Sequence, residues 1–215
     1  MPNKTTTLPH GTADLDTDDL KWLLLWERYR KSAVVSIVVL AVVAIVGGIY
    51  IYSRSVAATE AATALSKATD VAAWNRIVEQ YPQSIPAGDA LFLLARAQRD
   101  EGNLKESSAT YQKILDAYPK HPLVAEASLG LASNLAKEGK VDEAVQAYQQ
   151  TSAVYGASFV APIALFSQAH LLLAQGKQNE ALPILEVILS QYPDSLVSFA
   201  AESLVEQVRP LVSAP

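Results

Sequence analysis

The residue types that carry most enzyme and metal chemistry are scarce in this chain. Its 215 residues include no cysteine and three histidines. His10, His121 and His170 lie far apart and lack the spacing of a metal site. No motif for a serine nucleophile, a zinc protease or a phosphate-binding loop occurs. We therefore expect no enzyme activity, with no catalytic residue, metal or cofactor, and we interpret His121, in the loop sequence PKHP, as solvated.

The overall charge argues against nucleic acid as a partner. The formal net charge is −5, and the sequence has no cluster of lysines and arginines of the kind that binds phosphates. The absence of cysteine excludes disulfides and also the lipid-bearing N-terminal cysteine of a bacterial lipoprotein. Proteins and a membrane remain as the expected partners.

One uncharged stretch, SAVVSIVVLAVVAIVGGIYIY at residues 32–52, is long enough to cross a bilayer. As a helix its 21 residues extend about 30 Å, the thickness of the hydrocarbon layer. Ser55-Val56-Ala57 resembles a signal-peptidase site, but the apolar core of a signal peptide is usually only about 7–15 residues long. We therefore favour an uncleaved transmembrane helix over a cleaved signal peptide or a buried helix of a soluble core.

Basic and aromatic residues on either side of this stretch predict its orientation. Lys21, Arg28, Arg30 and Lys31 precede it, whereas only Arg54 closely follows it. Such an excess of positive charge marks the cytoplasmic side, so we expect residues 1–31 to form a cytoplasmic tail with an interfacial helix from about Asp18. Residues 53–215 are expected outside the cytoplasm, which in a Gram-negative bacterium is the periplasm. The residues expected to set the anchor and its topology are Trp22, Trp26, Arg28, Tyr29, Arg30 and Lys31.

The segment after residue 53 repeats itself every 37 residues. The period is kept by Tyr81-Pro82, Tyr118-Pro119, Tyr155-Gly156 and Tyr192-Pro193, by Gly102, Gly139 and Gly176, and by Ala95, Ala132 and Ala169. Each unit is predicted to be a pair of helices, the first ended by its glycine and the second by its proline or glycine. Pro183 falls inside a second helix and should kink it or mark a later start.

Small residues should let the two helices of each pair cross closely. Ala95, Ala132 and Ala169 occupy the first helices, and Ser107, Ala144 and Ala181 are their counterparts on the second. Residues 56–69 and 72–82 are expected to form a degenerate first pair, and the last helix, which has no partner, should cap the stack. The fold class is therefore all-α, with one transmembrane helix followed by a solenoid of helix pairs.

The repeat pattern resembles the tetratricopeptide repeat, although its period is longer than the commoner 34 residues. The motif is carried by Leu91-Leu94-Ala95 with Ser107-Tyr111-Ile114-Pro119, Ser128-Leu131-Ala132 with Ala144-Tyr148-Thr151-Gly156, and Leu165-Gln168-Ala169 with Ala181-Leu185-Ile188-Pro193. The resemblance implies a concave protein-binding face lined by the first helices. Its groove residues are expected to be Phe92, Arg96, Arg99, Leu129, Lys137, Phe166 and His170, with Asp89, Glu126, Ser133, Ile163 and Leu173 facing the same way.

This groove differs from the tetratricopeptide repeats that grip a carboxylate tail with lysine and asparagine. Phe92, Leu129 and Phe166 stand at those positions here. We expect an apolar stripe, edged by basic residues, that binds an extended or partly unfolded segment. The alternative is that Phe92 and Phe166 are packed inside the solenoid.

The layout of the whole chain resembles the ancillary subunit family of the bacterial Sec translocon. Its specific motif is LWERY, Leu25 to Tyr29, placed just before the span. The resemblance implies an inner-membrane protein that links the translocon to periplasmic chaperones or to the folding of exported proteins. The alternatives are a factor in envelope or outer-membrane assembly or in cell-division coordination, and self-association through the span.

Overall fold

The computed structural model describes the backbone of residues 17–212 and, of the side chains, those of Trp26 and of Arg28 onward. The predicted cytoplasmic tail, including His10, therefore lies largely outside the described residues, as do the side chains of Lys21 and Trp22. Every regular element in the described part is an α-helix. The chain divides into two units, residues 1–53 and residues 54–215, which are considered separately.

The first element, α1 (Thr17–Lys67), is a single helix of 51 residues. It joins three predicted pieces, the interfacial helix, the transmembrane helix and the first helix of the degenerate pair, because no glycine or proline turn signal separates them. From Arg28 onward α1 contains a stretch that is apolar and long enough to cross a membrane, and the most apolar part of that stretch buries no side chain against the protein. A helix that faces lipid has this pattern of exposure.

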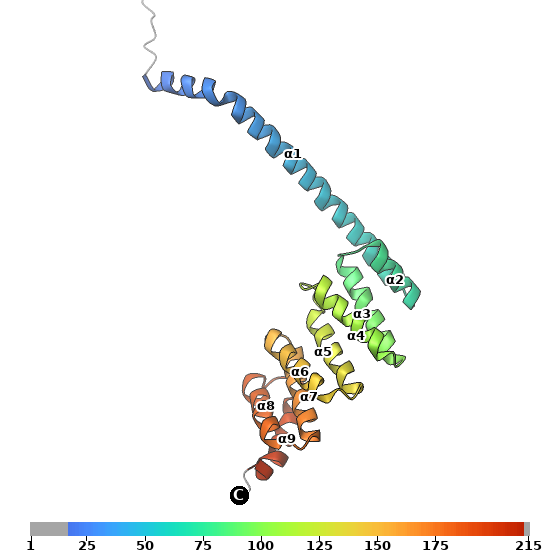
Figure 1. The fold of residues 1–215 in the computed structure, drawn as a ribbon. Helices are drawn as coiled ribbons and strands as arrows, with labels where there is room; N and C mark the ends of the chain where they lie inside the picture. The colour runs from blue at the N-terminus through green and yellow to red at the C-terminus, as the bar shows by residue number, and fades with distance from the viewer. Residues whose placement is uncertain (1–16, 213–215) are drawn as a thin grey trace, which may run out of the picture. The chain divides into compact units, whose positions relative to one another are not determined.

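The second unit is built from paired helices that follow one another in chain order (Figure 1). After α2 (Val71–Gln80), three pairs follow: α3 (Ile85–Asp100) with α4 (Leu104–Ala117), α5 (Val124–Lys137) with α6 (Val141–Val154), and α7 (Val160–Ala174) with α8 (Gln178–Gln191). The last element is α9 (Ser198–Val212). Each helix packs mainly on the helices before and after it, so the unit is a solenoid.

Glycine makes the turn inside each pair possible. Gly102, Gly139 and Gly176 have φ values of +85°, +77° and +73°, which residues with a side chain rarely adopt. After α3, the Gly102 N–H donates to the Arg99 carbonyl and the Asn103 N–H donates to the Gln98 carbonyl. This Schellman pattern recurs at the other two glycines and satisfies the last carbonyls of each helix, so the predicted helix ends are confirmed.

Close crossings hold the two helices of each pair together. Ala95, Ala132 and Ala169 are fully buried. Their counterparts Ser107, Ala144 and Ala181 are also fully buried. In the first pair the Ser107 hydroxyl donates to the Ala95 carbonyl at 2.7 Å, a contact that requires the backbones to approach closely. The predicted role of these small residues is confirmed.

The last two helices settle two further expectations. α8 begins at Gln178, so Pro183 does not mark a later start of this helix. Pro183 is exposed and lies inside the helix, where it cannot donate a helical hydrogen bond. α9 has no second helix and buries Ala201, Val205 and Val208. Its exposed side includes Glu202, Ser203 and Glu206, so α9 caps the stack as predicted.

Candidate protein-binding site

A hollow of about 340 Å³ lies where the first helices of the three pairs meet. Its lining residues come from α3, α5 and α7, and two tyrosines of the second helices complete it. They are Phe92, Arg96, Arg99, Tyr111, Glu126, Leu129, Gly130, Ser133, Tyr148, Ile163 and Ser167. The first helices can line it because Ala95, Ala132 and Ala169 turn another face of each helix toward its partner.

The first tyrosine of this hollow, Tyr111, depends on a glycine in the next pair. Tyr111 is 1% exposed, and its ring lies edge-on to Phe92 with ring centres 5.8 Å apart. A methyl group at Gly130 would lie 2.5 Å from the Tyr111 ring carbon that bears the hydroxyl. Glycine at position 130 therefore lets α5 pack directly on the ring. Burial raises the pKa of the Tyr111 phenol, and the charges of Arg99 and Arg96 oppose this shift.

The second tyrosine, Tyr148, occupies the same repeat position in α6. It is 5% exposed, and burial raises the pKa of its phenol. The neighbouring hydroxyls of Ser133 and Ser167 and the charge of Arg99 oppose part of the shift. Ser167 is the repeat counterpart of Gly130. The Ser167 hydroxyl interacts with the Tyr148 phenol, whereas Gly130 leaves room for the Tyr111 ring.

Charged groups with unused hydrogen-bonding capacity surround the aromatic residues. Arg96 is exposed and Arg99 is half-buried, and neither forms an ion pair within the described part of the chain. Glu126 has one carboxylate oxygen, Oε2, that is buried without a hydrogen-bond partner. Such a group is costly unless something donates to it. The hollow thus offers both donors and an acceptor beside an apolar surface.

The structure brings together four of the seven predicted groove residues. Phe92, Arg96, Arg99 and Leu129 line the hollow. The other three lie elsewhere. Lys137 is exposed at the end of α5, and Phe166 is half-buried against the hydrophobic cluster of α7, α8 and α9. His170 is exposed with its ring centre 6.2 Å from that of Phe166.

Four lining residues were not predicted to belong to the site: Tyr111, Gly130, Tyr148 and Ser167. Both tyrosines lie on second helices, whereas the groove was expected to be lined by first helices. The 37-residue period does carry a signal for them: it relates Tyr111 to Tyr148 and Gly130 to Ser167, so the two tyrosines and the residues they meet repeat together. A groove of this kind has a floor from second helices as well as walls from first helices.

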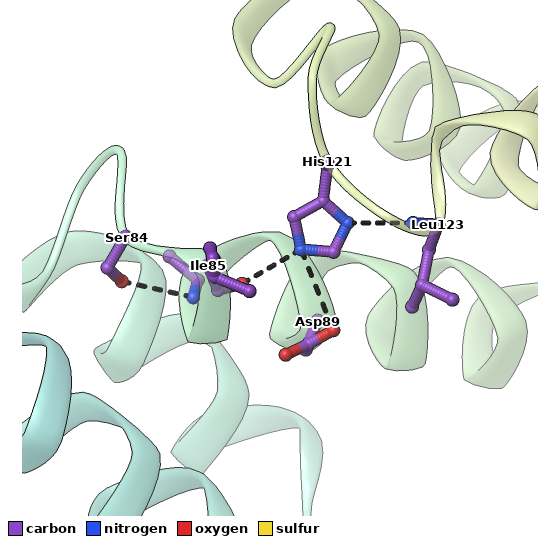
Figure 2. Close-up of polar contacts among 6 residues, drawn as sticks. Ser84, Ile85, Asp89, His121 and Leu123 are labelled. Carbon is purple, nitrogen blue, oxygen red and sulfur yellow. Dashed lines mark hydrogen bonds and ion pairs between the residues drawn. The ribbon is translucent and has the colours of Figure 1, made fainter.

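His121 is not the solvated loop residue that the sequence suggested. It is 5% exposed and links two pairs of helices, as Figure 2 shows. Its Nδ1 accepts the Leu123 N–H at 3.1 Å, so Nε2 carries the proton of the neutral ring and can donate to the Ile85 carbonyl 3.0 Å away. Asp89 Oδ1 lies 3.6 Å from the same nitrogen. A buried ring with three neighbours of this kind serves packing and helix capping.

His121 also stands at a repeat position that serine holds elsewhere. Ser84, Ser158 and Ser195 are its counterparts at intervals of 37 residues. The Ser84 hydroxyl caps α3 by accepting the Ala87 N–H, and the Ser158 hydroxyl accepts the Val160 N–H at the start of α7. His121 takes the same role with its ring nitrogen. No group of three or more metal-binding side chains occurs among the described residues.

Comparisons with known proteins agree with this geometry. Residues 86–157 and residues 129–195 match two family models, each described as a tetratricopeptide repeat. The chain is similar to the crystal structure of a tetratricopeptide repeat protein from Parabacteroides merdae, with 17% identity over 74% of this chain and a TM-score of 0.53. It spans 61% of the length of that protein.

A second similar structure contains nearly identical TPR-like repeats assigned to a kinesin light chain of Podosopora anserina. It has 19% identity, covers 74% of this chain and 92% of its own, and has a TM-score of 0.48. No curated protein matches the chain. The likeness to the Parabacteroides merdae structure shows the fold alone. The two family matches together extend across all three helix pairs. The helix pairs between residues 86 and 195 are therefore tetratricopeptide repeats.

Proposed function

We propose that this chain is a membrane-anchored protein-binding scaffold of the bacterial envelope. In this proposal α1 crosses the inner membrane with its N-terminus in the cytoplasm, and the repeats in the periplasm link the Sec translocon to chaperones or to the folding of exported proteins. The LWERY sequence before the span and the basic residues around it support the anchor and its orientation. Tetratricopeptide repeats are protein-interaction modules, which supports the scaffold.

The observation that carries the proposal is the hollow formed by α3, α5 and α7. Tyr111 and Tyr148 give it an aromatic floor, and Phe92 and Leu129 give it apolar walls. An extended segment can place an apolar side chain on this surface, while its backbone carbonyls accept from the arginines and a backbone N–H donates to Glu126. The site then gains the donor that Glu126 Oε2 lacks.

Photo-crosslinking from within the hollow tests binding at this site. A benzoylphenylalanine introduced at Ser133 is expected to capture a partner in intact cells, because Ser133 lines the hollow. Combining it with Arg96→Glu and Arg99→Glu should abolish the product by reversing the charge beside the floor. Arg76→Glu with Lys113→Glu makes the same charge change on exposed positions of α2 and α4 and should leave the product unchanged. If the folded variant with Arg96→Glu and Arg99→Glu still gives the crosslinked product, the proposed site is refuted.

A second experiment tests the role of the anchor. The native chain and a copy with residues 22–52 replaced by a cleavable signal are each crosslinked in intact cells and recovered with their partners. We expect translocon subunits with the native anchor only. Equal recovery by the soluble copy would refute the translocon part of the proposal. Recovery of outer-membrane assembly or division proteins in place of translocon subunits would favour the alternative function instead.

A further inference from the structure

The loops that carry the Tyr-Pro pairs build a similar notch twice along the edge of the solenoid. The first notch has a volume of about 500 Å³ and is lined by Arg54, Gln83, Ile85, Tyr118, Pro119 and Lys120, among others. The second has a volume of about 380 Å³ and includes Ala157, Phe159, Tyr192, Pro193 and Asp194. Each of these five residues is 74 positions, two repeat periods, beyond its counterpart in the first notch.

A tyrosine fixes the shape of each notch. The Tyr118 hydroxyl oxygen accepts the Gln83 N–H at 3.2 Å, which ties the loop after α4 to the loop after α2. The Tyr192 hydroxyl donates to the Gly156 carbonyl at 2.9 Å, which ties the loop after α8 to the loop after α6. The notches are thus pre-formed by the repeat, and a ligand does not have to order the loops that line them.

The two notches differ in charge. Lys120 in the first corresponds to Asp194 in the second. The first notch also includes Arg54, whose Nη2 lies 3.4 Å from the Gln83 carbonyl. Both Arg54 and Lys120 are exposed. Only the first notch therefore combines two cations with an aromatic ring and an exposed aliphatic side chain, that of Ile85, which is 62% exposed.

Chain connectivity places Arg54, one lining residue of the first notch, directly after the apolar stretch. Arg54 follows Tyr52, the last residue of the uncharged run, by two positions in the same unbroken helix. Two helical residues advance about 3 Å, whereas the headgroup layer on each side of a bilayer is about 5–7 Å thick. If α1 spans the membrane, Arg54 lies at the level of the lipid headgroups.

We propose that the first notch binds the headgroup of an anionic phospholipid in the leaflet that faces the repeats. Arg54 and Lys120 donate to the lipid phosphate, Tyr118 lies at the interface, and Ile85 contacts the upper acyl chain. His121 lies in the wall of the notch with its ring nitrogens already engaged, so it is not a ligand. This inference rests on the membrane anchor of the proposed function and does not depend on the groove.

Native mass spectrometry of the full chain in detergent micelles tests the site. Phosphatidylglycerol and phosphatidylcholine are titrated separately, and the bound lipid is measured for the native chain and for Arg54→Gln with Lys120→Gln. We expect preferential binding of phosphatidylglycerol. Each basic residue near an anionic lipid contributes about fivefold in affinity, so the double variant should lose roughly 25-fold. The matched control, Arg76→Gln with Lys113→Gln, should retain the preference.

Several outcomes would overturn the lipid site. Equal binding of the two lipids would do so, as would an unchanged phosphatidylglycerol affinity in the double variant. Displacement of the lipid by millimolar inorganic phosphate, but not by chloride at the same ionic strength, would assign the notch to a free phosphate group. Extraction of the chain from membranes by alkaline carbonate separates the two proposals, because it would refute the anchor itself, whereas loss of lipid preference in an anchored chain refutes only the notch.

Discussion

Direct contact between a helix backbone and an aromatic ring sets the geometry of the hollow at the residue scale. The Tyr111 ring occupies the space that a side chain at position 130 would need. The Tyr111 side chain is nearly fully buried, yet it forms part of the lining of the hollow where the three first helices meet. One glycine therefore decides both how closely α5 approaches α4 and how deep the hollow is.

Gly130→Ala should destabilise the second unit by about 1–3 kcal/mol, the usual cost of overpacking. The new methyl would lie 2.5 Å from Tyr111, so the ring or α5 must move. Urea denaturation of the full chain in detergent micelles, followed by circular dichroism, measures the effect. Gly156→Ala is the control, since the nearest atom to its methyl would be the Ser152 carbonyl oxygen at 3.4 Å. Equal stability of the two variants would contradict the packing described for Tyr111.

The two buried phenols predict a loss of stability at alkaline pH. Burial raises the pKa of Tyr111 and of Tyr148 above 10.0 in the folded chain. Between the unfolded and the folded pKa the folded state therefore binds more protons than the unfolded state. The stabilisation that the two protonated phenols contribute is complete below about pH 10, the unfolded pKa. It is lost as the pH rises through the folded pKa. Tyr111→Phe with Tyr148→Phe should flatten the fall in unfolding free energy between pH 9 and 11, and an identical fall in both proteins would refute this.

At the element scale, the middle pair of helices carries a polar contact where its neighbours are apolar. Leu91 with Ile114 and Leu165 with Ile188 lie in the hydrophobic clusters of the first and third pairs. Ser128 and Thr151 are their counterparts, and their hydroxyl oxygens are 2.7 Å apart. The Thr151 hydroxyl donates to the Ala147 carbonyl, so Ser128 is the donor to Thr151.

Replacing both Ser128 by leucine and Thr151 by isoleucine should stabilise the chain, whereas either substitution alone should not. Thr151→Ile alone leaves the Ser128 hydroxyl without its acceptor, and Ser128→Leu alone places leucine against the Thr151 hydroxyl. The double variant recreates the contact of the flanking pairs, and a hollow of about 270 Å³ beside Ser128 gives the leucine room. A double-mutant cycle by urea denaturation should show favourable coupling of about 1–2 kcal/mol. Additive effects would show that the two positions do not interact.

The 37-residue period predicted the helix pairs, their glycine turns and their small crossing residues, because these depend on features that each unit repeats. It could not distinguish Phe92 from Phe166, which share a repeat position. Phe92 lines the hollow, but Phe166 packs on the cluster that α9 completes. The environment of a repeat position thus depends on which unit follows it. His121 was misjudged for a similar reason: the Ile85 carbonyl that it meets belongs to the preceding pair.

At the scale of the whole molecule, contacts in the second unit join mainly consecutive helices, from α2 to α9. Stability in such a stack is approximately a sum of units and nearest-neighbour interfaces. The helices at the end of the stack have a neighbour on one side only. Opening of the C-terminal helices should therefore be separable from opening of the first complete pair.

Val205→Ala tests this separation. Val205 is 3% exposed and belongs to the cluster that joins α9 to α7 and α8. Removing two methyl groups should cost about 2 kcal/mol, so amides of α8 and α9 that exchange through local opening should exchange roughly 30-fold faster. Amides of α3 and α4 should be unaffected. In the control Ser203→Ala, which changes an exposed residue of α9, exchange of the whole chain should be unaffected.

Hydrogen-exchange mass spectrometry of the full chain reads each helix separately. Uniform acceleration from α3 to α9 would instead show that the repeats unfold as one cooperative unit, because the cost of a lost contact at one end would then reach the other.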